Sequence, residues 1–134
     1  MHEVIEIKEA AMTRNVVLKN VLTGTVDVCF DDSELISVNN NFAFMKIGKQ
    51  YDCKIELFGN ISSEEENKAV CCQVQKRDVM IGKKAFILVL VGHNEYYILT
   101  PDPDMIKGSD TIYFLCTRKN LISVDHVICE DLLK

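Results

Sequence analysis

Cysteine is the residue type best suited to nucleophilic or metal chemistry in this 134-residue chain, with six copies beside three histidines. A catalytic cysteine needs a cation or a helix N-terminus to stabilise its thiolate, and a base within hydrogen-bond reach. Cys71 and Cys72 are adjacent, so in a strand their side chains face opposite sides. The sequence holds no Cys-x-x-Cys pair and no spaced set of zinc ligands. We therefore expect neither a redox pair nor a zinc site.

The spacing of two other cysteines favours a structural role. Cys53 alternates in phase with Ile55 and Leu57, and Cys116 is in phase with Phe114. Free cysteine is among the most frequently buried residue types. The first residues also lack the basic segment and apolar segment of a secretion signal. We expect buried, reduced thiols in a soluble cytoplasmic protein.

His93 is the histidine placed best to contact a ligand. It lies in segment 92–95, between two apolar runs, where the sequence predicts a hairpin turn. A histidine at a hairpin tip could contact a partner or transfer a proton, but such tips are commonly only polar. An enzyme that uses His93 and a thiol is therefore the least supported alternative.

Acidic side chains gather in segments that the sequence predicts to be turns. A solvated polar loop is the simpler interpretation. The alternative is a surface for a basic partner, because concentrated charge steers the approach of an oppositely charged protein. The candidate partner-binding residues are Asp31, Asp32, Glu34, Glu64, Glu65, Glu66 and His93.

No motif in the chain predicts a cofactor or a metal ion. Asp102, Asp104 and Asp110 surround Gly108, but this segment lacks two of the ligand positions of a calcium-binding loop. The sequence has no phosphate-binding loop, no Gly-x-Gly-x-x-Gly and no Gly-x-Ser-x-Gly. We therefore assign no catalytic residues, no cofactor and no metal.

The net charge of −5 and the pI near 5.2 disfavour broad binding to a phosphate backbone. A local groove for a single-stranded nucleic acid stays open, because aromatic side chains stack bases beside lysines. The aromatic candidates are Phe42, Phe44, Tyr51, Tyr96, Tyr97 and Tyr113, and the basic ones are Lys46, Lys49, Lys54, Lys83 and Lys84. No apolar run approaches the roughly 20 residues that a membrane-spanning helix needs, so no membrane partner is expected.

The pattern of apolar residues predicts strands along most of the chain. Segment 51–57 alternates strictly, and the runs 85–91 and 96–99 flank a turn, which is typical of a buried hairpin. Further strands are expected in segments 16–18, 25–30, 35–38, 42–45, 69–75 and 111–117, whereas segment 3–12 fits a strand or a short helix. A short helical insert is expected in segment 62–68, and a final helix beginning at Ser123 would align Val124, Val127, Ile128 and Leu132.

These elements predict a single all-β domain over residues 1–134. A small Greek-key barrel of the oligonucleotide/oligosaccharide-binding (OB) type is favoured, and a two-layer β-sandwich is the alternative. Because no catalytic constellation is present, we expect a non-enzymatic binding or interaction module. One version is an acidic inhibitor or immunity-type protein that binds a basic partner, and single-stranded nucleic-acid binding is the main alternative. The sequence leaves the oligomeric state open.

Overall fold

The computed structural model describes residues 1–11, 13–32, 41–62, 68–100 and 110–134. In this part of the chain the elements are nearly all strands, which confirms the all-β prediction. The strands are β1 (His2–Glu9), β2 (Arg14–Asn20), β3 (Val26–Asp31), β4 (Gln50–Tyr51), β5 (Cys53–Ser62), β6 (Val70–Ile81), β7 (Lys84–Val91), β8 (Asn94–Leu99), β9 (Thr111–Val124) and β10 (Val127–Ile128). A 3-10 helix over Glu130–Leu133 ends the chain.

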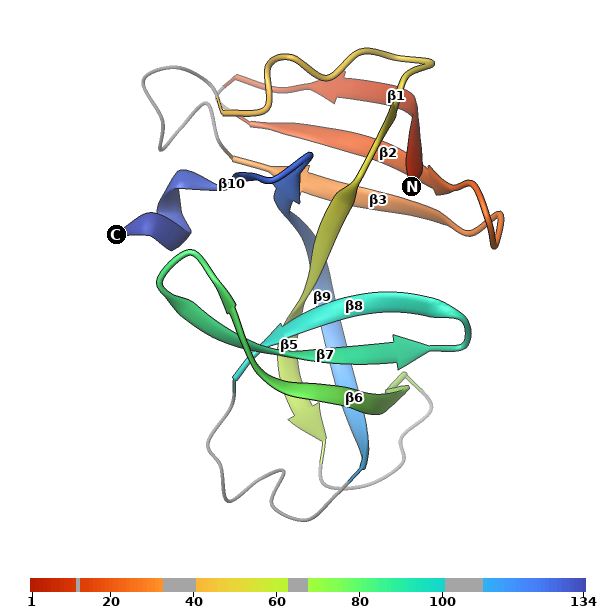
Figure 1. Ribbon diagram of the computed structural model, residues 1–134. Coiled ribbons are helices and arrows are strands. Elements are labelled where there is room, and N and C mark those ends of the chain that lie inside the picture. Colours follow the sequence, from red (N-terminus) through yellow and green to blue (C-terminus); the bar gives the residue numbers. More distant parts are fainter. Residues whose placement is uncertain (12, 33–40, 63–67, 101–109) are drawn as a thin grey trace.

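Five strands close into a small barrel, as predicted (Figure 1). Tight turns connect β6, β7 and β8 into a meander, and β9 returns to pair with β6. This arrangement of three hairpin-connected strands with a fourth beside the first is a Greek key. β5 completes the barrel, because it pairs antiparallel with β9 and parallel with β8. The circuit of pairings makes the fold a closed barrel and not the two-layer sandwich.

An N-terminal sheet with the order β4-β1-β2-β3 extends from the barrel (Figure 1). It joins the barrel through β3, whose Phe30 pairs in parallel with Asn120 of β9. One main cluster of buried side chains includes Val16 and Leu18 from this sheet as well as Ile87 and Val89 from the barrel. The sheet and the barrel therefore share a hydrophobic core.

Gly59 allows β5 and β9 to approach closely where the barrel wall bends. A register shift separates Phe58 from Gly59 in the pairing with β9. A Cβ atom on Gly59 would fall against the carbonyl oxygen of Leu115. Glycine in a strand commonly marks such a bend or close backbone approach. A side chain at position 59 would therefore force the two strands apart.

The hairpin of β7 and β8 lies in the core, as its apolar runs predict, but its side chains divide between two clusters. Ile87 and Val89 point into the main cluster, whereas Phe86 belongs to a second, smaller cluster. Leu88 is only partly buried and packs against that second cluster. Truncation of Leu88 should therefore cost less stability than truncation of a fully buried leucine.

The predicted final helix from Ser123 is wrong. β9 instead continues to Val124 and turns back into β10, and Asp125 and His126 adopt positive φ values of 48° and 70° in that turn. A helical pattern of apolar residues does not reveal such a turn. Only the 3-10 helix Glu130–Leu133 follows.

The structure tests two further predicted segments, whereas two others lie wholly or mostly outside the described residues. The strand expected over 42–45 is a turn, in which the Met45 N–H donates to the carbonyl oxygen of Phe42 at 3.1 Å. The ambiguous segment 3–12 contributes strand β1. The strand expected over 35–38 and most of the helical insert over 62–68 lie outside the described residues, although Ser62 itself ends β5.

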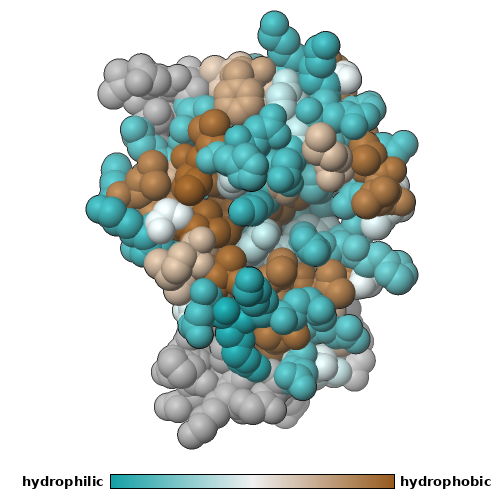
Figure 2. All heavy atoms as spheres, in the orientation of Figure 1, coloured by the Kyte–Doolittle hydropathy of each residue, from teal (hydrophilic) through white to brown (hydrophobic). Residues whose placement is uncertain are grey.

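The C-terminal segment docks on the turn between β6 and β7. The Lys83 N–H donates to the Leu132 carbonyl oxygen at 2.7 Å, and Leu132 packs on both hydrophobic clusters. Gly82 in that turn has φ +61°, and a Cβ there would meet the same Leu132 oxygen. Figure 2 shows apolar side chains gathered on the left, over this C-terminal segment and the turn.

Candidate functional site

Two acidic side chains of β3 are buried. Asp31, a candidate partner-binding residue, is only 2% exposed, and its Oδ2 accepts a hydrogen bond from Nε of Arg14 at 2.7 Å. Asp27 accepts a hydrogen bond from the Tyr96 hydroxyl at 2.7 Å and forms an ion pair with Lys119. Asp31 is therefore buried and does not lie on an exposed acidic surface. Its charge is compensated inside the protein by Arg14.

The remaining candidate residues do not form one site in the described structure. Asp32 is half-buried, whereas His93 is exposed in the turn between β7 and β8 and lines a separate hollow. Glu34, Glu64, Glu65 and Glu66 lie outside the described residues. Of the predicted acidic surface, the structure therefore places only Asp32 beside a hollow.

Most aromatic side chains of the nucleic-acid alternative are buried. Phe42, Tyr51, Tyr96 and Tyr97 contribute to the two hydrophobic clusters. Among the candidates only Phe44 is clearly exposed, and its ring packs edge-to-face on Tyr51 at 5.8 Å between centroids. Rings inside the core are not available to stack bases.

The hollow that contains His93 also contains Cys53, but the thiol is a poor nucleophile there. Its lining includes His2, Asp52 and Glu95, and its volume is about 270 Å³. Burial, together with the nearby Asp125 and Asp52 carboxylates, raises the pKa of the Cys53 thiol to about 12. A thiol with such a pKa stays protonated at neutral pH, whereas nucleophilic attack needs the thiolate.

Burial of the cysteines agrees with the structural role that we predicted. Cys53 and Cys72 are buried, whereas Cys71 is exposed, so the vicinal pair does face opposite sides of β6. Burial also raises the pKa of the Cys72 thiol to about 12 and that of the Cys129 thiol to about 11. Cys116 is half-buried and packs against the main cluster.

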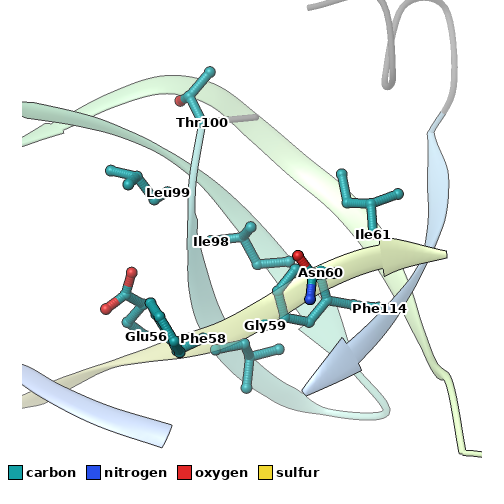
Figure 3. Close-up of a pocket in the computed structure, with 10 residues that line it drawn as sticks. Glu56, Phe58, Gly59, Asn60, Ile61, Ile98, Leu99, Thr100 and Phe114 are labelled. Carbon is teal, nitrogen blue, oxygen red and sulfur yellow. The ribbon is translucent and has the colours of Figure 1, made fainter. Parts of the chain in front are cut away.

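A groove on the barrel wall is the best-formed candidate site. It consists of two adjoining hollows, about 320 and 330 Å³ in volume, that share Glu56, Phe58 and Leu99. The first is also lined by Leu57, Gly59, Asn60, Ile61, Ile98, Thr100 and Phe114 (Figure 3). The second is also lined by Asp32, Lys84, Phe86, Arg118, Asn120, Leu121, Ile122, Cys129, Asp131 and Leu132. We call the two hollows together the β5–β8 groove.

The first hollow lies where β5 and β8 separate. In the described structure these strands share one ladder pair, Glu56 with Tyr97. From Phe58 to Ser62, β5 continues to pair with β9 on its other side. Figure 3 shows Ile98 and Phe114 lying together at the base of the hollow, with Leu99 and Thr100 farther along β8. The opening thus has an apolar floor between two strand edges.

Apolar and charged side chains surround the second hollow. Phe58 and Leu99, which line both hollows, are each 49% exposed. The Arg118 guanidinium lies over the Phe58 ring at 4.9 Å and over the Phe30 ring at 4.5 Å. Such cation–π contacts hold the guanidinium beside the aromatic wall.

Hydrogen bonds connect Arg118 to a carboxylate of the groove. Arg118 Nε donates to Oδ1 of Asn120 at 2.8 Å, and Asn120 Nδ2 donates to Oε1 of Glu56 at 3.0 Å. Burial raises the pKa of Glu56, although the Asn120 hydrogen bond and Arg118 act in the opposite direction. Burial likewise raises the pKa of Asp32, and the carboxylate of Asp131 adds to that effect. The groove therefore holds acidic groups that are partly removed from water.

Sequence reasoning missed most of the groove. Phe58, Arg118 and Asp131 were not singled out, and Glu56 was seen only as a polar residue of an alternating strand. One signal was available: Phe58 follows Lys54 and Glu56 on the side of the strand expected to face water. Contiguous exposed apolar residues mark binding surfaces, and Phe58 lies beside the exposed Leu99 in the groove.

Comparisons with protein-family models, with curated proteins and with solved structures found no match to this chain. Within the described ranges, no group of three or more histidine, cysteine, aspartate or glutamate side chains could hold a metal ion. The described residues also contain no helix long and apolar enough to cross a membrane.

Proposed function

We propose that this protein is a non-enzymatic binding module whose β5–β8 groove takes up a basic segment of a partner protein. The observation that carries the proposal is the lining of the groove, where Asp32, Glu56 and Asp131 stand beside the exposed apolar side chains Phe58 and Leu99. Interfaces commonly combine an apolar centre with a charged border. The overall charge of −5 favours a basic partner as well.

The partial burial of the carboxylates supports this choice of partner. Burial disfavours the charged form of a carboxylate and so raises the pKa values of Asp32 and Glu56. An incoming ammonium or guanidinium group would stabilise that charged form and lower both pKa values. Binding should therefore strengthen as the pH rises through the raised pKa values, because fewer protons remain to be displaced.

Basic side chains of the groove itself would restrict where the partner's charges bind. Arg118 and Lys84 line the same hollow as the three carboxylates. A partner with its own lysines or arginines would meet repulsion near these two residues and attraction near Glu56 and Asp131. Such alternation of charge supplies specificity more than affinity.

A fluorescence-anisotropy titration with a labelled, blocked peptide of alternating lysine and valine tests the proposal. Each of Glu56→Gln and Asp131→Asn should weaken binding by roughly 0.2–1 kcal/mol, the range for partly exposed ion pairs, and added salt should weaken the wild-type complex. Glu6→Gln, at an exposed position on β1 outside the groove, is the matched control and should leave binding unchanged.

Two outcomes contradict the proposal. The first is equal binding by the Glu56→Gln variant and by the Glu6→Gln control. The second is tight, salt-sensitive binding of single-stranded DNA or RNA that is lost on mutating Phe58 or Lys84, because the groove would then serve a nucleic acid.

A further inference from the structure

We infer that the partner is a second copy of this chain, whose loop over residues 44–49 binds in the β5–β8 groove. This inference rests on the proposed function and names the segment that the groove takes up. The loop combines two exposed apolar side chains, Phe44 and Ile47, with two exposed lysines, Lys46 and Lys49. It is therefore both basic and apolar, which complements the acidic and apolar lining of the groove.

The backbone of the loop is fixed by hydrogen bonds to strands β1 and β4. The Gly48 N–H donates to the Val4 carbonyl oxygen at 2.8 Å, and the Val4 N–H donates to the Lys49 carbonyl oxygen at 3.0 Å. The Lys46 N–H donates to the Tyr51 hydroxyl oxygen at 2.8 Å. A loop that is already ordered loses little conformational entropy when it binds. The exposed side chains are thus presented on a preformed surface.

The apolar side chains of the loop divide between the core and the solvent. Phe42 and Met45 pack in the main hydrophobic cluster and anchor the turn. Ile47 is instead 62% exposed and Phe44 is 41% exposed. Burying these two side chains against Phe58 and its neighbours in the groove would remove apolar surface from water, which is the main favourable term in most protein association.

The charges of the loop match those of the groove. Lys46 and Lys49 supply two cations, and Glu56 and Asp131 supply carboxylates beside the apolar wall. Two copies that each carry a net charge of −5 repel each other overall. At physiological ionic strength, however, exposed charges more than about 8 to 10 Å apart are largely screened. The local attraction between loop and groove therefore outweighs the general repulsion.

The loop of one copy does not bind in its own groove. Its hydrogen bonds to Val4 and Tyr51 hold it at the edge of the N-terminal sheet, whereas the groove lies where β5 and β8 meet in the barrel (Figure 1). The contact therefore joins different surfaces of two copies, which makes it a heterologous interface. Each copy can give its loop to one neighbour and accept a loop from another, so association extends into chains or rings. A contact made by one loop is small, and we expect it to be weak.

The turn between β6 and β7 is a second segment with exposed apolar and basic side chains. It presents Met80, Lys83 and Lys84. The C-terminal segment already docks on this turn, because the Lys83 N–H donates to the Leu132 carbonyl oxygen. Lys84 also lines the groove itself. The 44–49 loop is therefore the better candidate for the groove of another copy.

Sedimentation equilibrium of the full chain, from micromolar to millimolar concentration and at physiological ionic strength, tests the inference. A loop variant carries Lys46→Glu and Lys49→Glu. A groove variant carries Glu56→Gln and Asp131→Lys. Each variant alone should associate at least about fivefold more weakly than the wild type, because ion pairs are replaced by neutral or like-charged pairs. Lys8→Glu, at an exposed position on β1 outside the loop, is the matched control and should associate like the wild type.

An equimolar mixture of the two variants gives the decisive result. The groove variant keeps an intact loop, and the loop variant keeps an intact groove, so one productive contact remains. The mixture should therefore form a dimer of one copy of each variant, as tightly as the wild type forms its contacts, and no larger species. Both variants keep a net negative charge, so general charge attraction does not account for such pairing.

The other outcomes overturn the inference. If the wild type stays monomeric at millimolar concentration, the inference is wrong; the proposed function survives if the groove binds the lysine–valine peptide, and fails if it does not. If the loop variant associates like the wild type, or if the mixture restores no dimer, the copies meet through another surface. If circular dichroism shows that the groove variant is unfolded, Asp131→Lys alone, at an exposed position, takes its place.

Discussion

Replacing Asp31 by alanine should destabilise the protein far more than the same change at the neighbouring Asp32. Asp31 is 2% exposed and its partner Arg14 is 7% exposed. Arg14 also donates to the Phe42 carbonyl oxygen at 2.5 Å, so this guanidinium cannot turn to water without losing a contact between β2 and the 42–45 turn. Removing one member of a buried ion pair costs about 3–5 kcal/mol, because the other charge is left uncompensated.

Asp32 supplies the matched control. It is half-buried, and its raised pKa shows that its environment does not favour the charged carboxylate. Asp32→Ala should therefore change the free energy of unfolding by no more than about 0.5 kcal/mol, as is usual for substitutions away from buried networks. Urea denaturation followed by far-ultraviolet circular dichroism measures both variants, since the chain has no tryptophan to report by fluorescence.

A double variant separates lost charge compensation from lost packing. Arg14→Leu combined with Asp31→Leu removes both charges and retains apolar volume, so it should be more stable than Asp31→Ala. Equal unfolding midpoints for Asp31→Ala and Asp32→Ala would refute the reasoning, because the Asp31 carboxylate would then be solvated. Asp31 would then again be a candidate for contact with a partner protein.

Three further predictions concern other parts of the structure. Ellman's reagent should label Cys71 rapidly and Cys53 slowly in the native protein, because Cys71 is exposed and burial raises the pKa of Cys53 to about 12. Rapid labelling that persists in the Cys71→Ser variant would contradict this prediction. Gly82→Ala should destabilise the protein more than Gly92→Ala does, by at least about 1 kcal/mol. Both glycines have φ +61°, but only a Cβ atom at position 82 would meet the C-terminal segment. Equal losses of stability in the two variants would argue against docking of that segment. The Glu56→Gln variant should gain stability relative to wild type as the pH rises above the usual glutamate pKa. The reason is that the pKa of Glu56 is raised in the folded protein, so the wild type loses stability as Glu56 ionises. Denaturation midpoints of the two proteins that stay parallel across this pH range would contradict the prediction.

Local patterns predicted the strands, because alternation and turn residues act over a few positions. The 85–99 hairpin became strands β7 and β8 of the barrel. The period-two segment 51–57 became barrel strand β5 from Cys53 onward, whereas Tyr51 belongs to β4 of the N-terminal sheet. The closure of the barrel depends instead on pairing between distant segments, such as Val70 with Phe114. No local pattern encodes that pairing. The C-terminal hairpin escaped prediction for a different reason, since residues other than glycine took the positive φ values of its turn.

The candidate site was harder to predict than the fold. In the sequence Asp31 resembles a solvated turn residue, and Asp27 is one polar residue of a predicted strand. Their partners lie far along the chain, at Arg14 for Asp31 and at Tyr96 and Lys119 for Asp27. The same distance separates the residues of the groove, which come from β5, β8, β9 and the C-terminal segment. Only tertiary structure brings such residues together.

An NMR titration of the isotopically labelled protein with the alternating lysine–valine peptide tests the central claim most directly. If the β5–β8 groove binds a basic segment, the largest changes in amide chemical shift should map to Glu56, Phe58, Leu99 and Asp131, and they should saturate with peptide. The signals of Glu6, on the N-terminal sheet, should stay in place. Changes that scatter over all exposed acidic residues, or that centre on the hollow around His93, would contradict the assignment of the groove.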